Sequence, residues 1–123
     1  MRTVLLAAAL WVATVISAYA QDAVTVDPKH YKVEFENEQV RVLRINYGPG
    51  EKSVMHEHPA NVAVFLADGN VKFTTPDGKS QESPLKAGTT VWGSGEKHLP
   101  ENIGGKPFEL ILVELKGKAA PAK

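Results

Sequence analysis

The chain has 123 residues, with 14 Lys and Arg against 14 Asp and Glu, and it contains no Cys. This length is enough for one domain with a modest hydrophobic core. Because the charges balance, the composition excludes a typical nucleic-acid-binding protein, which has a basic excess, and a polybasic patch for anionic membranes. The absence of Cys excludes disulfides and lipid attachment through an N-terminal cysteine.

Residues 1–20 have the pattern of an export signal. Arg2 supplies a positive start, residues 4–16 form an apolar run, and Ala18-Tyr19-Ala20 is a small-x-small cleavage site before Gln21. The apolar run is shorter than the roughly 20 residues that span a bilayer as a helix. We therefore expect a cleaved signal peptide, a periplasmic or secreted protein and no stable membrane anchor. An uncleaved N-terminal anchor is the alternative.

The rest of the chain has the pattern of short β-strands separated by turns. Apolar and β-branched residues alternate with turn residues about every eight to twelve positions, and no window has a helical apolar period over three turns. We expect an all-β sandwich or barrel over residues 21–116 and a flexible C-terminal tail over 117–123. The expected strands are 32–36, 40–47, 54–58, 61–67, 71–75, 81–85, 89–93, 98–102 and 108–115.

Two short turns in this pattern predict β-hairpins. Residues 67–70 are Ala-Asp-Gly-Asn, and the Asp-Gly pair supports the positive φ of a tight hairpin turn. Residues 76–78 are Pro-Asp-Gly, which gives the same prediction for the next pair of strands.

The strands expected at 62–66 and 108–115 are apolar on both faces. A strand of this kind needs cover on each side. In a domain this small we expect the second cover to come from a partner subunit, and therefore expect a homodimer. The alternative is a monomer whose N-terminal segment folds over the sheet.

Three histidines form the candidate site. His56 and His58 are two positions apart on an expected strand, so their side chains point the same way, with Val54 as an apolar neighbour of the same parity. Pro59 restricts His58 to an extended backbone. His98 opens a later strand, which an antiparallel barrel can place beside the first. Converging imidazoles suit one divalent metal ion with positions open for substrate, and a solvated or hydrogen-bonded His pair is the alternative.

Other polar residues are weaker candidates. We expect His30 on the surface and Trp92 in the core or in a pocket wall. A metal-bound imidazole usually needs an outer partner for its second nitrogen. The candidates near the histidines in sequence are Asn61, Trp92, Glu96, Glu101 and Asn102. No residue is singled out as a catalytic acid or base.

Residues 50–69 resemble the first motif of the cupin family, G-x5-H-x-H-x3-4-E-x6-G. Gly50, His56, His58 and Gly69 keep the motif spacing. The family's glutamate ligand is missing, because Val62 stands in its place.

Residues 88–102 resemble the second cupin motif, G-x5-P-x-G-x2-H-x3-N. Gly88, His98 and Asn102 are in place, whereas Ser94-Gly95 replaces Pro-x-Gly in a loop one residue shorter. The resemblance covers about residues 40–115 and implies the cupin double-stranded β-helix, an RmlC-like jelly-roll barrel.

The resemblance also implies a three-His variant of the cupin metal site, on His56, His58 and His98. Cupins that resemble cysteine and diketone dioxygenases bind metal in this way. Without the glutamate the ion keeps its full +2 charge, which favours a chelating or anionic ligand. Fe(II) and Zn(II) suit such a site best, with Mn, Ni and Cu as alternatives.

Two functions follow from this reasoning. The first is a metal-dependent oxidoreductase, dioxygenase-like, that acts on a small chelating acid or ketone. The second is a non-catalytic cupin that binds a metal or a small ligand, since one fold hosts many functions. Neither function involves nucleic acid.

Overall fold

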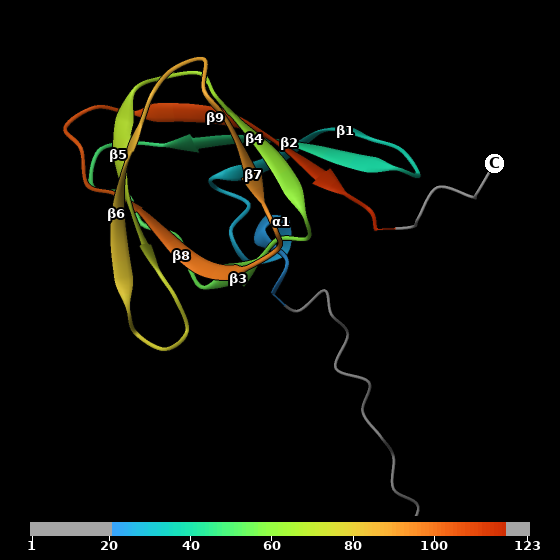
Figure 1. The fold of residues 1–123 in the computed structure, drawn as a ribbon, viewed down its shortest axis with the longest axis horizontal. Coiled ribbons are helices and arrows are strands. Elements are labelled where there is room, and N and C mark those ends of the chain that lie inside the picture. Colours follow the sequence, from blue (N-terminus) through green and yellow to red (C-terminus); the bar gives the residue numbers. More distant parts are fainter. Residues whose placement is uncertain (1–20, 118–123) are drawn as a thin grey trace, which may run out of the picture.

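The computed structural model describes residues 21–117, which form two antiparallel sheets facing each other (Figure 1). The larger sheet has the strand order β1 (Tyr31–Glu36), β2 (Val40–Tyr47), β9 (Phe108–Leu115), β4 (Asn61–Phe65) and β7 (Thr90–Gly93). The smaller sheet has the order β3 (His56–Glu57), β8 (Lys97–Asn102), β5 (Gly69–Thr74) and β6 (Ser80–Leu85). The expected signal peptide and nearly all of the expected tail lie outside the described residues.

The strands alternate between the two sheets along the chain. After β2, every connection except β5–β6 takes the chain from one sheet to the other. This is the jelly-roll arrangement, and it confirms the all-β prediction. The bounds of β2 and β9 agree with the sequence prediction, and those of the other strands differ from it by a few residues.

One of the two predicted hairpins is wrong. β4 and β5 lie in different sheets, so residues 67–70 form a crossover rather than a tight turn. Gly69 is there because the sheets approach closely: a Cβ atom at this position would lie 3.2 Å from the Phe108 side chain. The hairpin predicted at 76–78 is confirmed, since β5 pairs with β6 from Gly69↔Leu85 to Thr74↔Ser80.

The core lies between the two sheets. Leu43 on β2 is paired with Leu112 on β9, Tyr47 is paired with Phe108, and all four side chains are buried. Val71 of the smaller sheet belongs to the same cluster. Because side chains alternate along a strand, the residues of the opposite parity, such as Val42 and Val113, face outward.

The outer face of the larger sheet carries an apolar row that crosses all five strands. Phe35 is paired with Val42, Val42 with Val113, Val113 with Val62, and Val62 with Trp92. The row ends in two exposed aromatic side chains, since Phe35 is 55% and Trp92 60% exposed. Strands β4 and β9 are therefore apolar on both faces, as the sequence predicted.

The N-terminal residues of the described chain close one end of the barrel. Helix α1 (Ala23–Val26) contacts β1 and β3, and Ala23 is fully buried. Asp22 caps the helix by accepting a hydrogen bond from the Thr25 amide. This segment does not cover the outer apolar row, and no helix among residues 21–117 has the length and apolar character needed to cross a membrane.

Candidate metal centre

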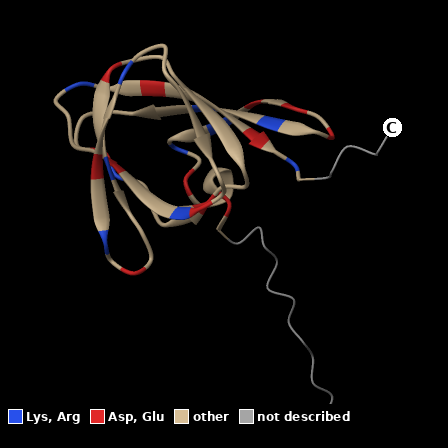
Figure 2. Ribbon diagram, viewed as in Figure 1, with Lys and Arg blue, Asp and Glu red and all other residues tan. Residues whose placement is uncertain are grey.

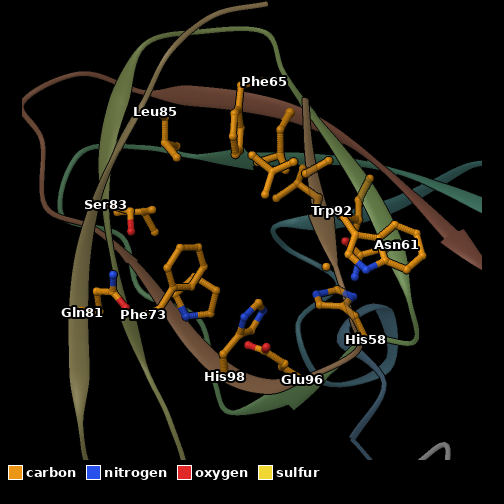
Figure 3. Close-up of a pocket in the computed structure, with 18 of the residues that line it drawn as sticks. His58, Asn61, Phe65, Phe73, Gln81, Ser83, Leu85, Trp92, Glu96 and His98 are labelled. Carbon is orange, nitrogen blue, oxygen red and sulfur yellow. The ribbon is translucent and has the colours of Figure 1, made fainter. Parts of the chain in front are cut away.

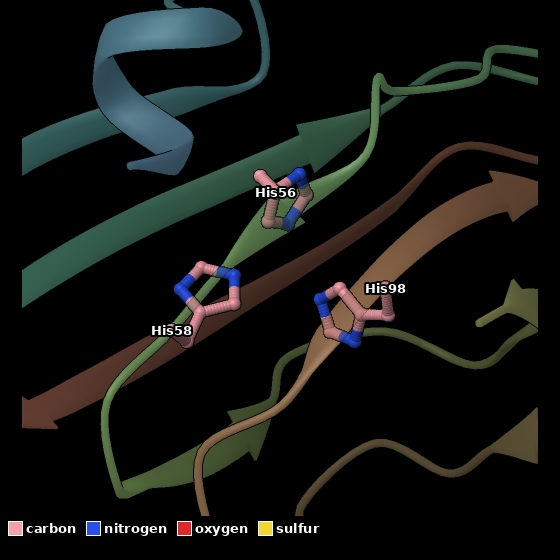
Figure 4. A group of neighbouring side chains, drawn as sticks. All are labelled: His56, His58 and His98. Atoms are coloured by element: carbon pink, nitrogen blue, oxygen red, sulfur yellow. The ribbon is translucent and has the colours of Figure 1, made fainter. Parts of the chain in front are cut away.

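The three predicted histidines meet at one end of the barrel (Figure 4). β3 pairs with β8 so that His56 lies directly opposite His98, and His58 follows two positions along the chain. The ring centroids are 4.8 Å apart for His56 and His58, 4.9 Å for His56 and His98, and 5.3 Å for His58 and His98. The convergence predicted from the sequence is confirmed.

The hydrogen bonds of two rings determine which nitrogen is free. His56 Nδ1 donates to the Val54 carbonyl at 2.8 Å, and His58 Nδ1 donates to Glu114 Oε2 at 2.7 Å. Each ring therefore keeps the lone pair of Nε2 for a metal. The Nε2 atoms of His56 and His98 are buried and have no hydrogen-bond partner within residues 21–117.

The donor set fits one divalent ion. The three ligand nitrogens all lie within 4.8 Å of one another. A metal at about 2.1 Å from each nitrogen needs the rings to move inward by under about 1 Å each. Buried imidazole nitrogens without a partner are costly unless they bind something, and a metal ion satisfies all three at once.

The electrostatics of the site keep two of the rings neutral. Burial, with a further contribution from the neighbouring His58, lowers the pKa of His56 to about 4. Burial followed by the other two rings lowers the pKa of His98 to about 3. At neutral pH both rings are therefore in the form that binds metal.

A chain of charged groups holds His58 from behind. Glu114, at 2% exposure, accepts from His58 through Oε2 and from Arg41 Nε through Oε1, the second bond at 2.7 Å. Arg41 also donates to the carboxylate of Asp22. Burial opposes the charge of Arg41, but these hydrogen bonds outweigh burial and raise its pKa.

Glu114 is a functional residue that the sequence reasoning missed. It lies on β9 with the parity of the inward residues Phe108, Leu110 and Leu112, where an acid is unexpected. The sequence feature that could have indicated it is this single acidic residue at an inward position. It was hidden because β9 is apolar on both parities, so its inward face was not evident.

A second polar cluster supports His56. Ser53 Oγ donates to Asp27 Oδ2 at 2.6 Å and lies 3.3 Å from His56 Nδ1. His30 Nδ1 is 2.7 Å from the same Asp27 oxygen, and its ring stacks on Tyr47 at a centroid distance of 4.2 Å. The prediction of a surface position for His30 is wrong: its exposure is 5%, because α1 folds the N-terminal segment against the barrel.

Two tyrosines connect this cluster to the site. The hydroxyls of Tyr31 and Tyr47 are 2.6 Å apart, and the Tyr31 ring meets His56 edge-to-face at 4.8 Å. Burial raises the pKa of both phenols, so both remain protonated at neutral pH. Tyr47 faces the interior, and the pair provides O–H groups beside the imidazoles.

The comparisons with known proteins identify the family. The sequence model of the cupin domain family matches residues 43–114, which is more than half of the chain and includes all three histidines. The chain is a cupin. A comparison of this cupin with curated proteins found no match.

Solved structures agree with the assignment. A cupin domain from Bordetella pertussis Tohama I is 28% identical, with a TM-score of 0.66, and the match covers 71% of this cupin and 92% of that chain. A double-stranded β-helix protein from Klebsiella pneumoniae is 25% identical, with a TM-score of 0.58 and coverage of 73% and 78%. An RmlC-like cupin from Methanocaldococcus jannaschii shares the fold at 24% identity and a TM-score of 0.55, with coverage of 72% and 83%.

The missing glutamate of the first cupin motif has a structural explanation. Val62 belongs to the outer apolar row, so a side chain there faces away from the histidines. The inward positions of β4 are Asn61, Ala63 and Phe65, which all line the cavity. Val54, expected to point inward, is instead 48% exposed, and it contacts His56 through its backbone carbonyl.

The remaining sequence candidates have different roles. The Asn102 side chain donates to the carbonyls of Tyr47 and Lys106. It therefore links β2 to the loop before β9 and does not support a histidine. Glu101 is paired with Lys72 at 3.1 Å, away from the histidines. Glu96 and Trp92 line the cavity, which confirms the pocket-wall prediction for Trp92.

The altered loop of the second motif still positions His98. Gly95 has φ +96°, which favours glycine, and a Cβ atom here would lie 3.2 Å from the His58 carbonyl oxygen. The adjacent Glu96 carbonyl accepts from the His58 amide at 3.3 Å. Ser94-Gly95 therefore brings this loop against β3 without the proline of the family motif.

The site opens into the interior of this cupin. A cavity of about 770 Å³ is lined by His58 and His98, and by Tyr31 and Tyr47 (Figure 3). Phe73, which stacks on the His98 ring at a centroid distance of 5.2 Å, forms an adjoining wall. A ligand in the cavity therefore reaches two of the three imidazoles directly.

Proposed function

We propose that this cupin binds one divalent metal ion through Nε2 of His56, His58 and His98 and is a dioxygenase-like oxidoreductase acting on a chelating acid or ketone. The observation that carries the proposal is the convergence of three imidazoles, two of which line the same cavity. The absence of an inward carboxylate on β4, where Asn61 and Ala63 face the cavity, leaves space for a chelating ligand.

A divalent ion on three imidazoles supplies Lewis acidity and open coordination positions for a chelating substrate and dioxygen. Fe(II) suits this chemistry, and Zn(II) is the main alternative. A dioxygenase puts both atoms of dioxygen into its substrate, so the substrate itself supplies the electrons. The chain contributes neutral ligands, the hydrogen-bonded pair of Tyr31 and Tyr47 phenols, and apolar wall residues.

A non-catalytic role in metal or small-ligand binding is the second candidate. It is favoured by the small number of ionisable groups around the cavity: besides the histidines and tyrosines, the lining residues within 21–117 include only Lys79 and Glu96 with charged side chains. Both are exposed, so neither is a buried acid or base.

Metal analysis and oxygen uptake test the proposal. Protein purified without chelators or a His tag is expected to contain close to one metal ion per chain, and the Fe(II) form should consume dioxygen when chelating acids or ketones are added. His58→Ala should abolish stoichiometric metal, and Glu82→Gln, at an exposed position of β6 that does not line the cavity, should retain it. Metal retained in His58→Ala would overturn the ligand set. Bound metal with no oxygen uptake across the panel would favour the non-catalytic role.

Homodimer formation through the outer apolar row is part of the proposal. The row Phe35–Val42–Val113–Val62–Trp92 crosses the whole larger sheet, and a second copy is the occupant that matches it. Sedimentation equilibrium should give twice the chain mass, and Trp92→Ser with Val113→Ser should give the monomer mass. A wild-type monomer would overturn this part.

Export is also proposed, on the sequence of residues 1–20. Cell fractionation should place the protein outside the cytoplasm, and N-terminal sequencing should begin at Gln21. Lys and Arg are interspersed with Asp and Glu along the ribbon (Figure 2). This mixed distribution of charge supports a protein that binds no nucleic acid. Cytoplasmic protein that begins at Met1 would contradict the proposal.

A further inference from the structure

The cavity has two chemically different sides. His58, His98 and Glu96 lie on one side, and Phe65 and Leu85 lie on the opposite side (Figure 3). The far side is extended by Val71, Phe108 and Leu110, which belong to or contact the buried core. A ligand that chelates the metal at the histidines therefore extends toward an apolar wall.

This far side offers no oppositely charged partner to an ionised group, since the polar residues of β6 beside it, Gln81 and Ser83, are neutral. Among residues 21–117, Lys79 is the only lysine or arginine that lines the cavity, and its side chain is 87% exposed and lies 3.9 Å from Asp77. An ionised group on the body of a ligand would lose water without gaining an oppositely charged partner, which is unfavourable. The charge of the ligand is therefore confined to the end that meets the metal.

The size of the cavity excludes a good fit for a very small acid. At about 770 Å³ it lies in the range of sites that bind drug-sized molecules. A ligand consisting of a chelating group alone would leave the apolar side unfilled, and so would gain none of the free energy of burying apolar surface. Phe73, stacked on His98, extends a flat wall away from the chelating end.

The route into the cavity lies between two strand edges. β6 and β7 are the outermost strands of their sheets in the described chain, and they do not pair with each other. Exposed residues of both edges line the cavity, including Gln81 on β6 and Val91 and Trp92 on β7. The opening thus has an apolar side at Val91, which suits entry of an apolar molecule.

We infer that the ligand of this site is an apolar, ring-bearing molecule with a chelating pair of oxygens at one end, rather than a small acid. The inference rests on the proposed metal function, and it narrows the substrate class of that same site. The two-sided cavity determines the orientation: the oxygen pair at His58 and His98, and the body against Phe65 and Leu85.

Hydroxamates of equal chelating power test the inference on the Co(II)-loaded protein. We expect 4-methylbenzohydroxamate to bind at least about tenfold more tightly than acetohydroxamate and than 4-carboxybenzohydroxamate, because only the first has an apolar ring body. The visible spectrum of Co(II) reports chelation.

A charge placed on the far side should reverse the preference. Leu85→Lys is expected to raise the affinity for 4-carboxybenzohydroxamate relative to the 4-methyl compound by about tenfold. Leu66→Lys is the matched control, since Leu66 is exposed and does not line the cavity, and it should change nothing. If Leu85→Lys fails to fold, Ser83→Lys places the same charge on the cavity side of β6.

The possible failures are distinguishable. If the protein binds no Co(II), the metal function falls and this inference falls with it. If Co(II) binds stoichiometrically but the three hydroxamates have affinities within twofold, the inference is overturned and the metal function stands. If acetohydroxamate or the carboxylated ring binds most tightly, the site takes a small or anionic ligand and the inference is wrong.

Discussion

His58 Nδ1 lies 2.7 Å from Glu114 Oε2, and the carboxylate is buried between this ring and Arg41. The pair joins the residue that follows β3, in the smaller sheet, to β9 in the larger sheet. In carboxylate–histidine–metal arrangements the outer carboxylate fixes the ring orientation and raises the basicity of the ligand nitrogen. Glu114 thus supplies negative charge to a site that lacks the cupin glutamate, through a hydrogen bond to the far side of the His58 ring rather than as a ligand.

Replacing Glu114 with Gln should weaken metal binding without removing it. We expect a loss of about 10- to 100-fold in affinity for Zn(II) or Co(II), because the amide keeps the shape but loses the charge that orients His58. Competition with a chromophoric chelator measures the change. The control is Glu109→Gln on the same strand, where the carboxylate pairs with Arg44 on the outer face and metal affinity should stay unchanged. Equal affinity in wild type and Glu114→Gln would contradict the role given to the carboxylate.

Replacing Arg41 with Met should destabilise the fold. Glu114 would then be a buried carboxylate without its cationic partner, and breaking such a pair costs about 3 kcal/mol in free energy of unfolding. Arg44→Met is the matched control, since Arg44 pairs with Glu34 and Glu109 on a more exposed face, where a pair contributes about 1 kcal/mol or less. Urea denaturation of both metal-free variants provides the comparison. Equal losses would show that burial around Arg41 does not matter.

The metal-free protein should lose stability as the pH falls from about 6.5 toward 4. In the unfolded chain histidine titrates near pH 6.5, whereas burial and the neighbouring rings lower the pKa of His56 to about 4 and of His98 to about 3. In this window the unfolded state binds more protons, so the free energy of unfolding rises with pH. This contribution to the free energy of unfolding is fully present above pH 6.5. It is lost as the pH falls toward the folded-state pKa values of His56 and His98.

Urea midpoints between pH 7 and pH 5 measure this dependence while most carboxylates stay ionised. The comparison is a double variant, His56→Gln with His98→Gln, whose midpoint should change less over the same range. Parallel pH curves for the two metal-free proteins would mean that these rings do not carry the effect.

The sequence predicted the ligands more completely than their surroundings, for a physical reason. His56 and His58 are close in sequence, and strand parity alone places them on one side. His98 required the family spacing, which the pairing of β3 with β8 confirms. Glu114, Arg41 and Asp22 come from three distant segments, and only the placement of β9 between β2 and β4 brings Arg41 opposite Glu114.

Local rules failed where a tertiary contact decided the structure. The Asp68-Gly69 pair satisfies the pattern of a hairpin turn, yet the chain crosses between sheets there, and the glycine is explained by its close approach to Phe108. His30 has a polar sequence neighbourhood typical of a surface residue, but the Asp27 carboxylate and the Tyr47 ring give it buried partners. Neither contact leaves a periodic signal in the sequence.

The direction of β4 predicts where the missing ligand of the cupin motif can be restored. Ala63 faces the cavity and Val62 faces the outer apolar row, so of these two neighbours only position 63 can direct a carboxylate toward the histidines. Ala63→Glu should tighten Zn(II) binding by about tenfold or more, since an added anionic ligand needs to contribute only about 1.4 kcal/mol to do so. Val62→Glu is the matched control, with the same charge on the opposite face, and should leave metal affinity unchanged. Competition with a chromophoric chelator measures both variants. If Val62→Glu strengthened binding and Ala63→Glu did not, β4 would have the opposite face toward the histidines, and the register that pairs Asn61 with Glu114 would be wrong.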